Sequence, residues 1–528
     1  MTRQPLFQPS TRREFVRRAL LTGAGTAAAV SAVSRGMGAS AAAGTPASKE
    51  ITIAVPIYWG TLDYRKLSDY NDWRVAELTY SALVRNDDQF RPIPDLAQKW
   101  EQPDPKTLVF HLRSAKFHDG TAVTSQDVKS TFDSVLDVNF GAPNRPLFAS
   151  IAAVDAPDPQ TVIMHLSAPS PSLMAFLPWV GIVPQHYAAQ HPDLVATHPI
   201  GCGPYKFVST IQQSQTVLEA FGDYWGGVPA FETLTFHVIP EDTTRTIEIQ
   251  SGNVDIATTI AFSDISTIKQ DPNLYTIEVA PNGFSYIGLN MQNPILADLR
   301  VRQAIAYAID RDAINAAVYD GLCTKAIGPV IPSSWGYDKD VTVYDYDPVK
   351  SKQLLAAAGH SQGLSFKMTS LNTQEFTEIA TILTQELGKI GIHLQVTLLE
   401  QTVLTQQVLK GVIGDLILGF GWGEQMDPLQ HMYRQFLSAN QPPHGYNFVH
   451  YTNPELDKAL IGANTTIDIT QRKKYLDQAQ QIITANVPYV FLFNEPEFWA
   501  VSKHVANVTA PPPMDRQFLD LAMKAKTT

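Results

Sequence analysis

Short apolar runs and longer helical periods alternate along this 528-residue chain. The run "ITIAV" at 51–55 is rich in β-branched residues and is followed by Tyr58, Trp59 and Gly60, which predicts a strand and then a turn. Aromatic residues at such a strand end either pack in a core or line a cleft. In "KTLVFHLR" the spacing places Leu108, Phe110 and Leu112 on one face of a predicted strand, and "QTVIMHLS", "SQTVLEAF" and "LTFHVI" are likewise predicted to be strands. The pattern indicates a mixed α and β protein.

In the second half of the chain, apolar residues at helical spacing are bounded by residues typical of helix caps and stops. Apolar residues recur at helical spacing over 299–318, and again from Phe376 to Ile390, where Gly391 precedes a strand in "GIHLQVTLLE". Cap and stop signals predict further helices, which begin after Thr124 or Ser125, run from Asp347-Pro348 to Gly359, begin at Asn453-Pro454, and run from Thr470 to a stop before Pro488.

One strand-end loop combines chemistry-bearing residues in a way that packing alone does not require. The stretch "GFGWGEQMDPLQ", residues 419–430, follows the apolar run "DLILG" and places an aromatic residue, two acids and an amide between glycines and a proline. Asp427-Pro428 is typical of a helix start, a cap followed by a first-turn proline. The rest of the loop is a candidate for packing, catalysis or ligand binding.

The N-terminus has the three parts of an export signal. Arg12 and Arg13 lie in a twin-arginine context, an Ala/Gly-rich apolar segment runs from Ala19 to Val33, and small residues end near 41–43. The apolar segment is shorter than the roughly 20 residues of a spanning helix, and there is no cysteine for lipid attachment near the cut. We therefore expect cleavage near residue 43, export through the twin-arginine machinery, and a soluble periplasmic protein that is not a lipoprotein.

Loss of residues 1–43 removes six basic residues and one acid, which changes the net charge from −11 to −16. Nucleic acids and anionic lipids are bound chiefly through an excess of Lys and Arg, so this balance argues against both as partners. The length after cleavage suggests about three domains of roughly 150 residues. Cys202 and Cys323 do not form a disulfide framework, and we expect both to be unpaired.

A search for enzyme chemistry finds no catalytic constellation. The chain has no G-x-S-x-G, H-E-x-x-H or C-x-x-C motif and no phosphate-cradling glycine loop. Its acid pairs, such as Glu495 with Glu497, are typical of solvated surface unless they are held around a substrate. The histidines near residues 186–198 and 431–450 are too widely spaced for a structural zinc site. We predict no catalytic residue, no cofactor and no metal site.

Several stretches, in order, resemble the extracytoplasmic solute-binding proteins of family 5, which serve oligopeptide, dipeptide and nickel ABC importers. They include "PIPDLAQKWEQPDPKTLVFHLRSAKFHDGTAVTSQDV", "PIGCGPYKF", "YIGLNMQNPILADLRVRQAIAYAIDRDAI", "YDYDPVKSKQLLAAAGH", "YTNPELDKAL" and "NVPYVFLF". The resemblance extends from about Ile51 to about Val505. Cys202 stands where the family usually has Ser or Thr.

The resemblance implies an α/β, periplasmic-binding-protein-like clam shell of class II (cluster C type) with an extra small α+β domain. Lobe I would be discontinuous and comprise 50–88, 197–285 and 490–528, the small domain 89–196, and lobe II 286–489. The chain would cross between lobes near Phe284 and Val490. Closure about those crossings would bury a solute, because only the closed state lets it contact both lobes.

The implied function is capture of a peptide or peptide-like solute and its delivery to the permease subunits of an ABC importer, with the ATPase subunits contacted indirectly. Opines, oligosaccharides and metal chelates lie within the same family range and remain alternatives. A secreted hydrolase is the rival class, and it lacks the required motifs. We expect a monomer.

The resemblance also places candidate ligand contacts. Tyr58 and Trp59 match a cleft position of the first lobe, while Asn372 and the 419–430 loop, with Trp422, would line the second. Peptide binders carry W-x-x-D-Y-x-D-P in this loop, where the first aspartate pairs with the ligand's ammonium group. This chain has Gln425 at that spacing and a loop shorter by one residue, so either Glu424 takes the role or there is no ammonium to pair.

Four further residues are candidates on chemical grounds. Arg145 and Arg434 would contact a carboxylate of the solute, if it has one. Tyr446 and Asn447 follow a Pro/Gly loop and would supply stacking and an amide contact.

Overall fold

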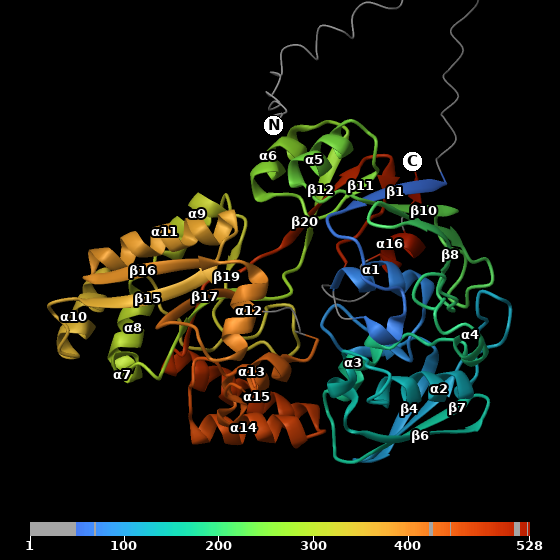
Figure 1. Ribbon diagram of the computed structural model, residues 1–528, viewed down its shortest axis with the longest axis horizontal. Coiled ribbons are helices and arrows are strands. Elements are labelled where there is room, and N and C mark those ends of the chain that lie inside the picture. The colour runs from blue at the N-terminus through green and yellow to red at the C-terminus, as the bar shows by residue number, and fades with distance from the viewer. Residues whose placement is uncertain are drawn as a thin grey trace, which may run out of the picture. The chain divides into compact units, whose positions relative to one another are not determined.

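The computed structural model describes residues 49–67, 70–421, 426–443, 445–511, 518–524 and 526–527 (Figure 1). The predicted signal peptide, 1–43, lies outside these residues, as do Trp422, Glu424 and Gln425. Everything below concerns the compact unit that begins at Ala47.

The first strand of the described chain lies at the centre of a seven-stranded sheet, counted over the described residues. β1 (Glu50–Val55) is the predicted strand "ITIAV", and it pairs in parallel with β10 on one side and β11 on the other. Its neighbours come from distant parts of the sequence. The sheet order is β12 (Leu274–Val279), β20 (Glu497–Ser502), β11 (Ile256–Ala257), β1, β10 (Thr233–Val238), β9 (Gln215–Ala220) and β8 (Tyr205–Ile211).

A separate sheet of four described strands is wholly antiparallel, in the order β4 (Ala97–Asp104), β5 (Thr107–Leu112), β7 (Thr161–Leu166), β6 (Ile151–Asp158). The alternation predicted for β5 is confirmed, because positions 108, 110 and 112 are buried. Helix α2 (Ser125–Leu136) packs on β6 and β7. Thr124 caps this helix through a reciprocal capping box with Asp127, as the sequence predicts.

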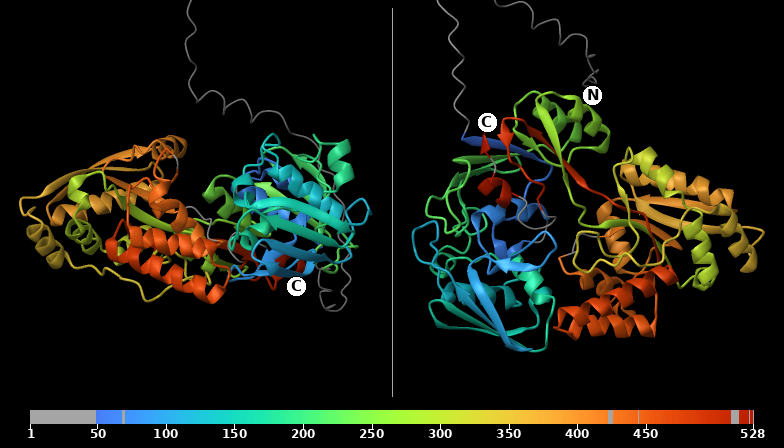
Figure 2. Two further views of the ribbon diagram at one scale, coloured as in Figure 1. Left: turned by 90° about the horizontal axis from the view of Figure 1, so that it is seen from below. Right: turned by 180° about the vertical axis from the view of Figure 1, so that it is seen from behind.

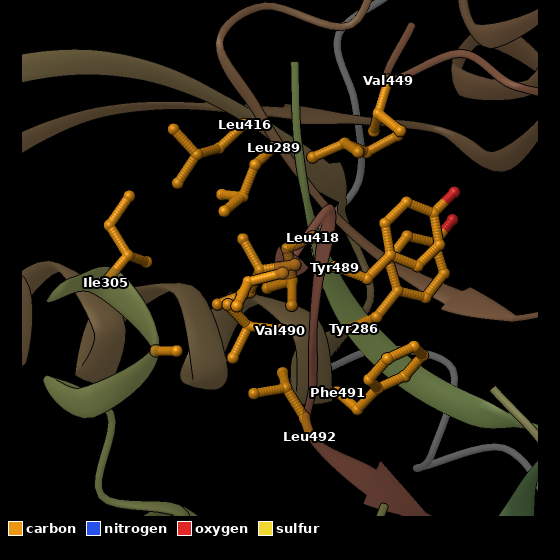
Figure 3. Packing of buried hydrophobic residues seen from close by; sticks show 14 of the residues in the cluster. Tyr286, Leu289, Ile305, Leu416, Leu418, Val449, Tyr489, Val490, Phe491 and Leu492 are labelled. Carbon is orange, nitrogen blue, oxygen red and sulfur yellow. The ribbon is translucent and has the colours of Figure 1, made fainter. Parts of the chain in front are cut away.

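In the second half of the chain, the described strands form a five-stranded sheet in the order β16 (Ile392–Leu399), β15 (Leu364–Leu371), β17 (Leu416–Gly421), β13 (Phe284–Leu289), β18 (Tyr489–Phe491). Every residue of β13 is buried. Tyr286 stacks on Tyr489 with ring centroids 4.2 Å apart and planes within 2°, and the two phenol groups point the same way in Figure 3. Helix α11 (Gln374–Lys389) packs along β15 and β16 (Figure 1).

The other elements connect and cover these sheets, and α14 and α15 lie side by side in Figures 1 and 2. The helices are α1 (Tyr70–Thr79), α3 (Leu173–Phe176), α4 (Gln185–Gln190), α5 (Asp242–Gln250), α6 (Phe262–Gln270), α7 (Pro294–Ala297), α8 (Leu299–Tyr307), α9 (Arg311–Val318), α10 (Pro348–Ala357), α12 (Gln401–Leu409), α13 (Pro428–Phe436), α14 (Pro454–Thr465), α15 (Ile469–Asn486) and α16 (Leu519–Lys524). Short turns of 3-10 helix are η1 (Tyr64–Lys66), η2 (Arg145–Phe148), η3 (Leu177–Trp179) and η4 (Ser438–Asn440), and the small strand pairs are β2 (Val84–Asn86) with β3 (Pro92–Pro94), β14 (Thr324–Lys325) with β19 (Phe493–Asn494), and β21 (Val505–Ala506) with β22 (Lys526–Thr527).

The single helix predicted over 299–318 is wrong, because the structure has α8 and α9 there instead. The break comes from Asp310, whose side chain accepts a hydrogen bond from the Ala313 N–H at 3.0 Å and so caps a new helix. Its own N–H donates to Glu386 Oε2 at 3.1 Å. The other predicted starts are confirmed, since Asp347 and Asn453 cap α10 and α14 with proline in the first turn.

The chain passes from the seven-stranded to the five-stranded sheet between β12 and β13, and it returns between β18 and β20. The two passing segments are hydrogen-bonded to each other. The Leu492 N–H donates to the Ser285 carbonyl at 2.8 Å, and the Asn494 side-chain amide donates to the Gly283 carbonyl at 3.0 Å. They form one two-stranded connection.

A partly buried acidic cluster lies beside this connection. The Tyr319 hydroxyl contacts Glu375 Oε1 and, at 2.9 Å, Glu495 Oε1. One hydroxyl hydrogen cannot be donated to two carboxylates, so a proton on one of the carboxyl groups satisfies the second contact. Burial, with the charge of Glu375 as the next cause, raises the pKa of Glu495 to about 8.

Cys202 and Cys323 are both buried and free, which confirms that they are unpaired. In the described part of the chain, no helix combines the length and the apolar character needed to cross a membrane.

Candidate functional site

The structure has a cavity of about 470 Å³ at the end of β17, between helices α12 and α13. Strands β13 and β17 supply Tyr286, Ile417 and Gly419 to its floor, and Leu371 comes from the end of β15. Tyr446 and Phe448 reach it from the loop after η4. The cavity falls within the roughly 300–1,000 Å³ that small-molecule sites occupy.

Helix α12 contributes one face to the cavity. Gln401, Leu404, Thr405 and Val408 line it, and their spacing of three and four residues places them on one side of the helix. Glu400 caps α12 by accepting from the Thr402 N–H at 2.9 Å. This wall is mostly aliphatic, with an amide and a hydroxyl group on it.

Helix α13 contributes the opposite wall through His431, Arg434 and Gln435, which also follow helical spacing. The helix begins as the sequence predicts, because Asp427 accepts from the Leu429 N–H at 3.0 Å and Pro428 occupies the first turn. All polar groups on this wall therefore come from a single helix whose start is well defined.

The start of α13 is anchored by a buried ion pair. Both carboxylate oxygens of Asp427 accept from Arg472, at 2.7 and 2.8 Å, and both side chains are almost fully buried. Arg472 also donates to Ser172 Oγ at 2.9 Å, in the chain region of the four-stranded sheet. Gly336 packs so closely on Pro428 that a Cβ at 336 would lie 2.3 Å from the proline Cβ. These contacts fix the position at which α13 begins.

Two polar atoms on the α13 wall are buried without a hydrogen-bond partner among the described residues. They are His431 Nε2 and Gln435 Oε1, in side chains that are 5% and 8% exposed. The His431 ring packs edge-on against Phe284 with centroids 4.8 Å apart. Burial lowers the pKa of His431 to about 4, so the imidazole is neutral near pH 7. Buried polar groups normally have a partner, and these two residues also line the cavity, so the pair is a candidate for contact with a ligand.

Two of the predicted contact residues meet at the cavity. The Arg434 guanidinium lies over the Tyr446 ring, 4.2 Å from its centroid, and both residues line the cavity. Arg434 is half-buried and Tyr446 is exposed, so they form the solvent-facing part of the wall.

The other predicted contact residues that the structure describes lie outside the cavity lining. Trp59 is 3% exposed and packs in the core on Phe236. Tyr58 is half-buried, with its hydroxyl 3.0 Å from Thr210 Oγ1. The Nε of Arg145 donates to the Leu136 carbonyl at 2.8 Å.

Asn372 and Asn447 flank the cavity in different ways. Asn372 is exposed and directly follows Leu371. Asn447 is completely buried, and its amide donates to the carbonyls of Leu437 and Tyr451 while its oxygen accepts from the Tyr451 N–H. The Asn447 side chain therefore holds its loop together, which replaces the predicted contact with a solute. Trp422, Glu424 and Gln425 lie outside the described residues.

The sequence interpretation missed the lining residues on α12 and the roles of His431 and Gln435. A usable signal was present, because positions 431, 434 and 435 form a polar i, i+3, i+4 set on a helix that starts just after a glycine-rich strand end. Within the described ranges, no group of three or more His, Cys, Asp or Glu side chains is placed to hold a metal ion.

Comparison with known proteins gives one family. Residues 91–443 match the model for bacterial extracellular solute-binding proteins, family 5 (middle). The glutathione-binding protein GsiB of Pectobacterium atrosepticum is 28% identical over 88% of this chain and 92% of its own.

Two solved solute-binding proteins have a similar fold. The oligopeptide-binding protein AppA of Bacillus subtilis, in complex with a nonapeptide, has a TM-score of 0.74 at 25% identity, covering 91% of this chain and 99% of AppA. NikZ of Campylobacter jejuni, in complex with Ni(L-His), has a TM-score of 0.74 at 26% identity, covering 88% of this chain and 96% of NikZ. The predicted two-lobed, clam-shell α/β fold is confirmed by this likeness. The chain belongs to the bacterial extracellular solute-binding proteins, family 5.

Proposed function

We propose that this protein is the receptor of an ABC importer and that it binds a peptide or peptide-like solute at the cavity between α12 and α13. The observation that carries the proposal is this cavity of about 470 Å³, with two buried polar atoms that have no partner in the described chain. The names of the relatives support the solute class, because GsiB is a glutathione-binding protein and AppA was solved with a nonapeptide.

The proposal includes a division of the chain into lobes. Lobe I comprises 50–88, 197–285 and 490–528, the small domain 89–196, and lobe II 286–489. Support comes from sheet membership, since the seven-stranded, four-stranded and five-stranded sheets draw their strands from these three sets of residues, apart from the first two residues of β13 and the last two of β18, which fall in the lobe I ranges. On this division, the cavity belongs to lobe II, and Tyr58 of lobe I contributes from the other side when the lobes close, while Trp59 supports the Tyr58 ring from the core at a centroid distance of 4.4 Å.

The ligand contacts that we propose are those of the resemblance, adjusted by the geometry. Arg434 and Tyr446 act at the cavity mouth, with Asn372 beside it. The loop supplies Trp422, Glu424 and Gln425, and Glu424 takes the ammonium of an amine-bearing solute. Arg145 remains a candidate for a solute carboxylate that extends toward the small domain.

We further propose that the protein acts without breaking bonds. Residues 1–43 direct export through the twin-arginine machinery and are removed, and the protein then works as a periplasmic monomer that delivers its solute to the permease subunits. A non-peptide solute is the second candidate, favoured by the likeness to NikZ, whose structure holds a nickel–histidine chelate.

Native mass spectrometry of the protein as isolated tests the proposal, because a closed cleft retains its solute through purification. We expect a bound mass of peptide size, and a rise in melting temperature when the same peptide is added to the stripped protein. A nickel–histidine mixture serves as the parallel probe. Turnover of a mixed peptide and glycoside panel, or no response to any peptide, contradicts the peptide-receptor proposal.

A further inference from the structure

Among the described residues that line the cavity between α12 and α13, the polar side chains that are buried lie on α13. Leu404, Val408 and Ile417 present aliphatic groups, and Phe448 presents an aromatic ring. Opposite them, His431 Nε2 and Gln435 Oε1 are enclosed without a well-formed hydrogen bond in the described chain, although the two side chains interact with each other one turn apart on α13. Leaving a buried polar atom unpaired costs about 1–3 kcal/mol, so a bound group that pairs with both atoms gains that free energy back.

The buried part of this wall carries no net charge. Neutral imidazole has one nitrogen that donates and one that accepts, and the amide oxygen of Gln435 only accepts. Burial keeps His431 neutral, with a pKa of about 4. Among the described lining residues, the one cationic group is Arg434, which lies at the more accessible side and stacks on Tyr446 at 4.2 Å. An anion that reached Gln435 would be repelled by the carbonyl oxygen of its amide. A cation would be repelled by Arg434 in the same cavity.

From this arrangement we infer that the cavity is a specificity subsite for an uncharged group with an apolar body and a hydrogen-bond donor at its tip, such as a carboxamide, phenol or indole, recognised by His431 Nε2 and Gln435 Oε1. The inference rests on the proposed function, because it names the part of the solute that this receptor selects. Arg434 then excludes cations and orients the rest of the solute at the mouth. A carboxylate of the same shape is the group that the subsite rejects.

Benzamide and benzoate test the inference directly, since they have the same shape and differ in charge and in the donor. Their affinities for the stripped full-length protein are measured by ligand-observed NMR titration. We expect benzamide to bind at least about fivefold more tightly than benzoate, a difference that one satisfied buried hydrogen bond of about 1 kcal/mol provides. Gln435→Met and His431→Phe keep the size of each side chain and remove the polar atom. Both should bring the two affinities to within about twofold.

Stability gives a second readout that a purely structural role would not produce. Because each variant removes an unpartnered buried atom, the melting temperature of the stripped protein should stay equal or rise. His118→Phe is the matched control. His118 also has a pKa lowered to about 4 by burial, but its ring bonds the Gly203 carbonyl at 3.0 Å and the Gly201 N–H at 3.3 Å, and it lies outside the cavity lining. This control should lower the melting temperature and leave the benzamide preference unchanged.

The outcomes separate the inference from the proposed function. Benzoate binding as tightly as benzamide, a preference that survives Gln435→Met, or no binding of either fragment at millimolar concentration overturns the inference. These results do not depend on peptides. Failure of every peptide to bind, with the benzamide preference intact, would instead contradict the peptide receptor while leaving the subsite in place.

Discussion

Two strand ends of this protein have the same sequence signature and different structures. After β1, Tyr58 and Trp59 precede a glycine, and the tryptophan is packed against Phe236 with 3% of its surface exposed. After β17, the chain runs through another glycine-flanked tryptophan toward α13, and here the neighbouring helices leave a cavity of about 470 Å³. An aromatic residue at a strand end therefore predicts a site only where the flanking helices stand apart.

The largest expected effect breaks the first strand end. Trp59→Ala removes a fully packed ring, so we expect the free energy of unfolding to fall by about 4 kcal/mol. Tyr446→Ala, in the lining of the cavity beside the second strand end, removes a side chain that is 40% exposed and should cost less than about 1 kcal/mol. Urea unfolding followed by circular dichroism compares the two variants. Equal losses in the free energy of unfolding would contradict the difference in burial between Trp59 and Tyr446.

The second prediction breaks the anchor of α13. Arg472→Met leaves the buried Asp427 carboxylate without its two charged hydrogen bonds, and we expect a loss of about 3 kcal/mol in the free energy of unfolding. Adding Asp427→Asn to that variant removes the unpaired charge and should recover part of the loss. A double variant that is less stable than Arg472→Met alone would contradict the ion pair as the cause.

The third prediction tests whether the loop after β17 binds the solute. If Glu424 takes the solute's ammonium, Glu424→Gln should raise the dissociation constant of an amine-bearing peptide by roughly tenfold or more, because a charge-assisted hydrogen bond contributes about 1.5–3 kcal/mol. The N-acetylated form of the same peptide is the control, and its affinity should not change. Isothermal titration calorimetry provides both constants. An unchanged constant for the free amine would remove Glu424 from the site.

The last prediction concerns the connection between the two regions. The pKa of Glu495 is raised to about 8, so the folded protein binds more protons than the unfolded one between about pH 4.5 and pH 8. Stability is therefore lost as pH rises through that window. Glu495→Gln is uncharged at every pH, so its melting temperature relative to the parent should increase from pH 5 to pH 8. An equal melting-temperature difference at pH 5 and pH 8 would contradict a raised pKa of Glu495 in the folded protein.

Local signals predicted the elements well, because their causes lie within a few residues of each other. The Asp-Pro and Asn-Pro pairs that open α10, α13 and α14 act through hydrogen bonds to the next turn. The break between α8 and α9 was missed since Ala308 and Ile309 continue the apolar period, and only the cap at Asp310 shows that the helix restarts.

The site was predicted only in part, because its walls are brought together by pairing between distant strands. Arg434 and Tyr446 were predicted and do meet. The face of α12 that lines the cavity depends on β15 lying beside β17, a contact between segments that are far apart in the chain. For Asn447 the sequence predicted a ligand contact, because an amide follows proline and glycine in a loop. In the structure this amide donates hydrogen bonds to the carbonyls of Leu437 and Tyr451.

The paired connection between the two larger sheets has a mechanical consequence. The segments at 283–285 and 492–494 are hydrogen-bonded to each other, so neither can slide along or stretch away from the other without breaking these bonds. We therefore expect the pair to resist shear and to allow twisting and bending. Stress applied to one segment is shared by both. A glycine inserted into one segment should therefore make the connection more flexible, while the other segment still limits the distance between the two sheets.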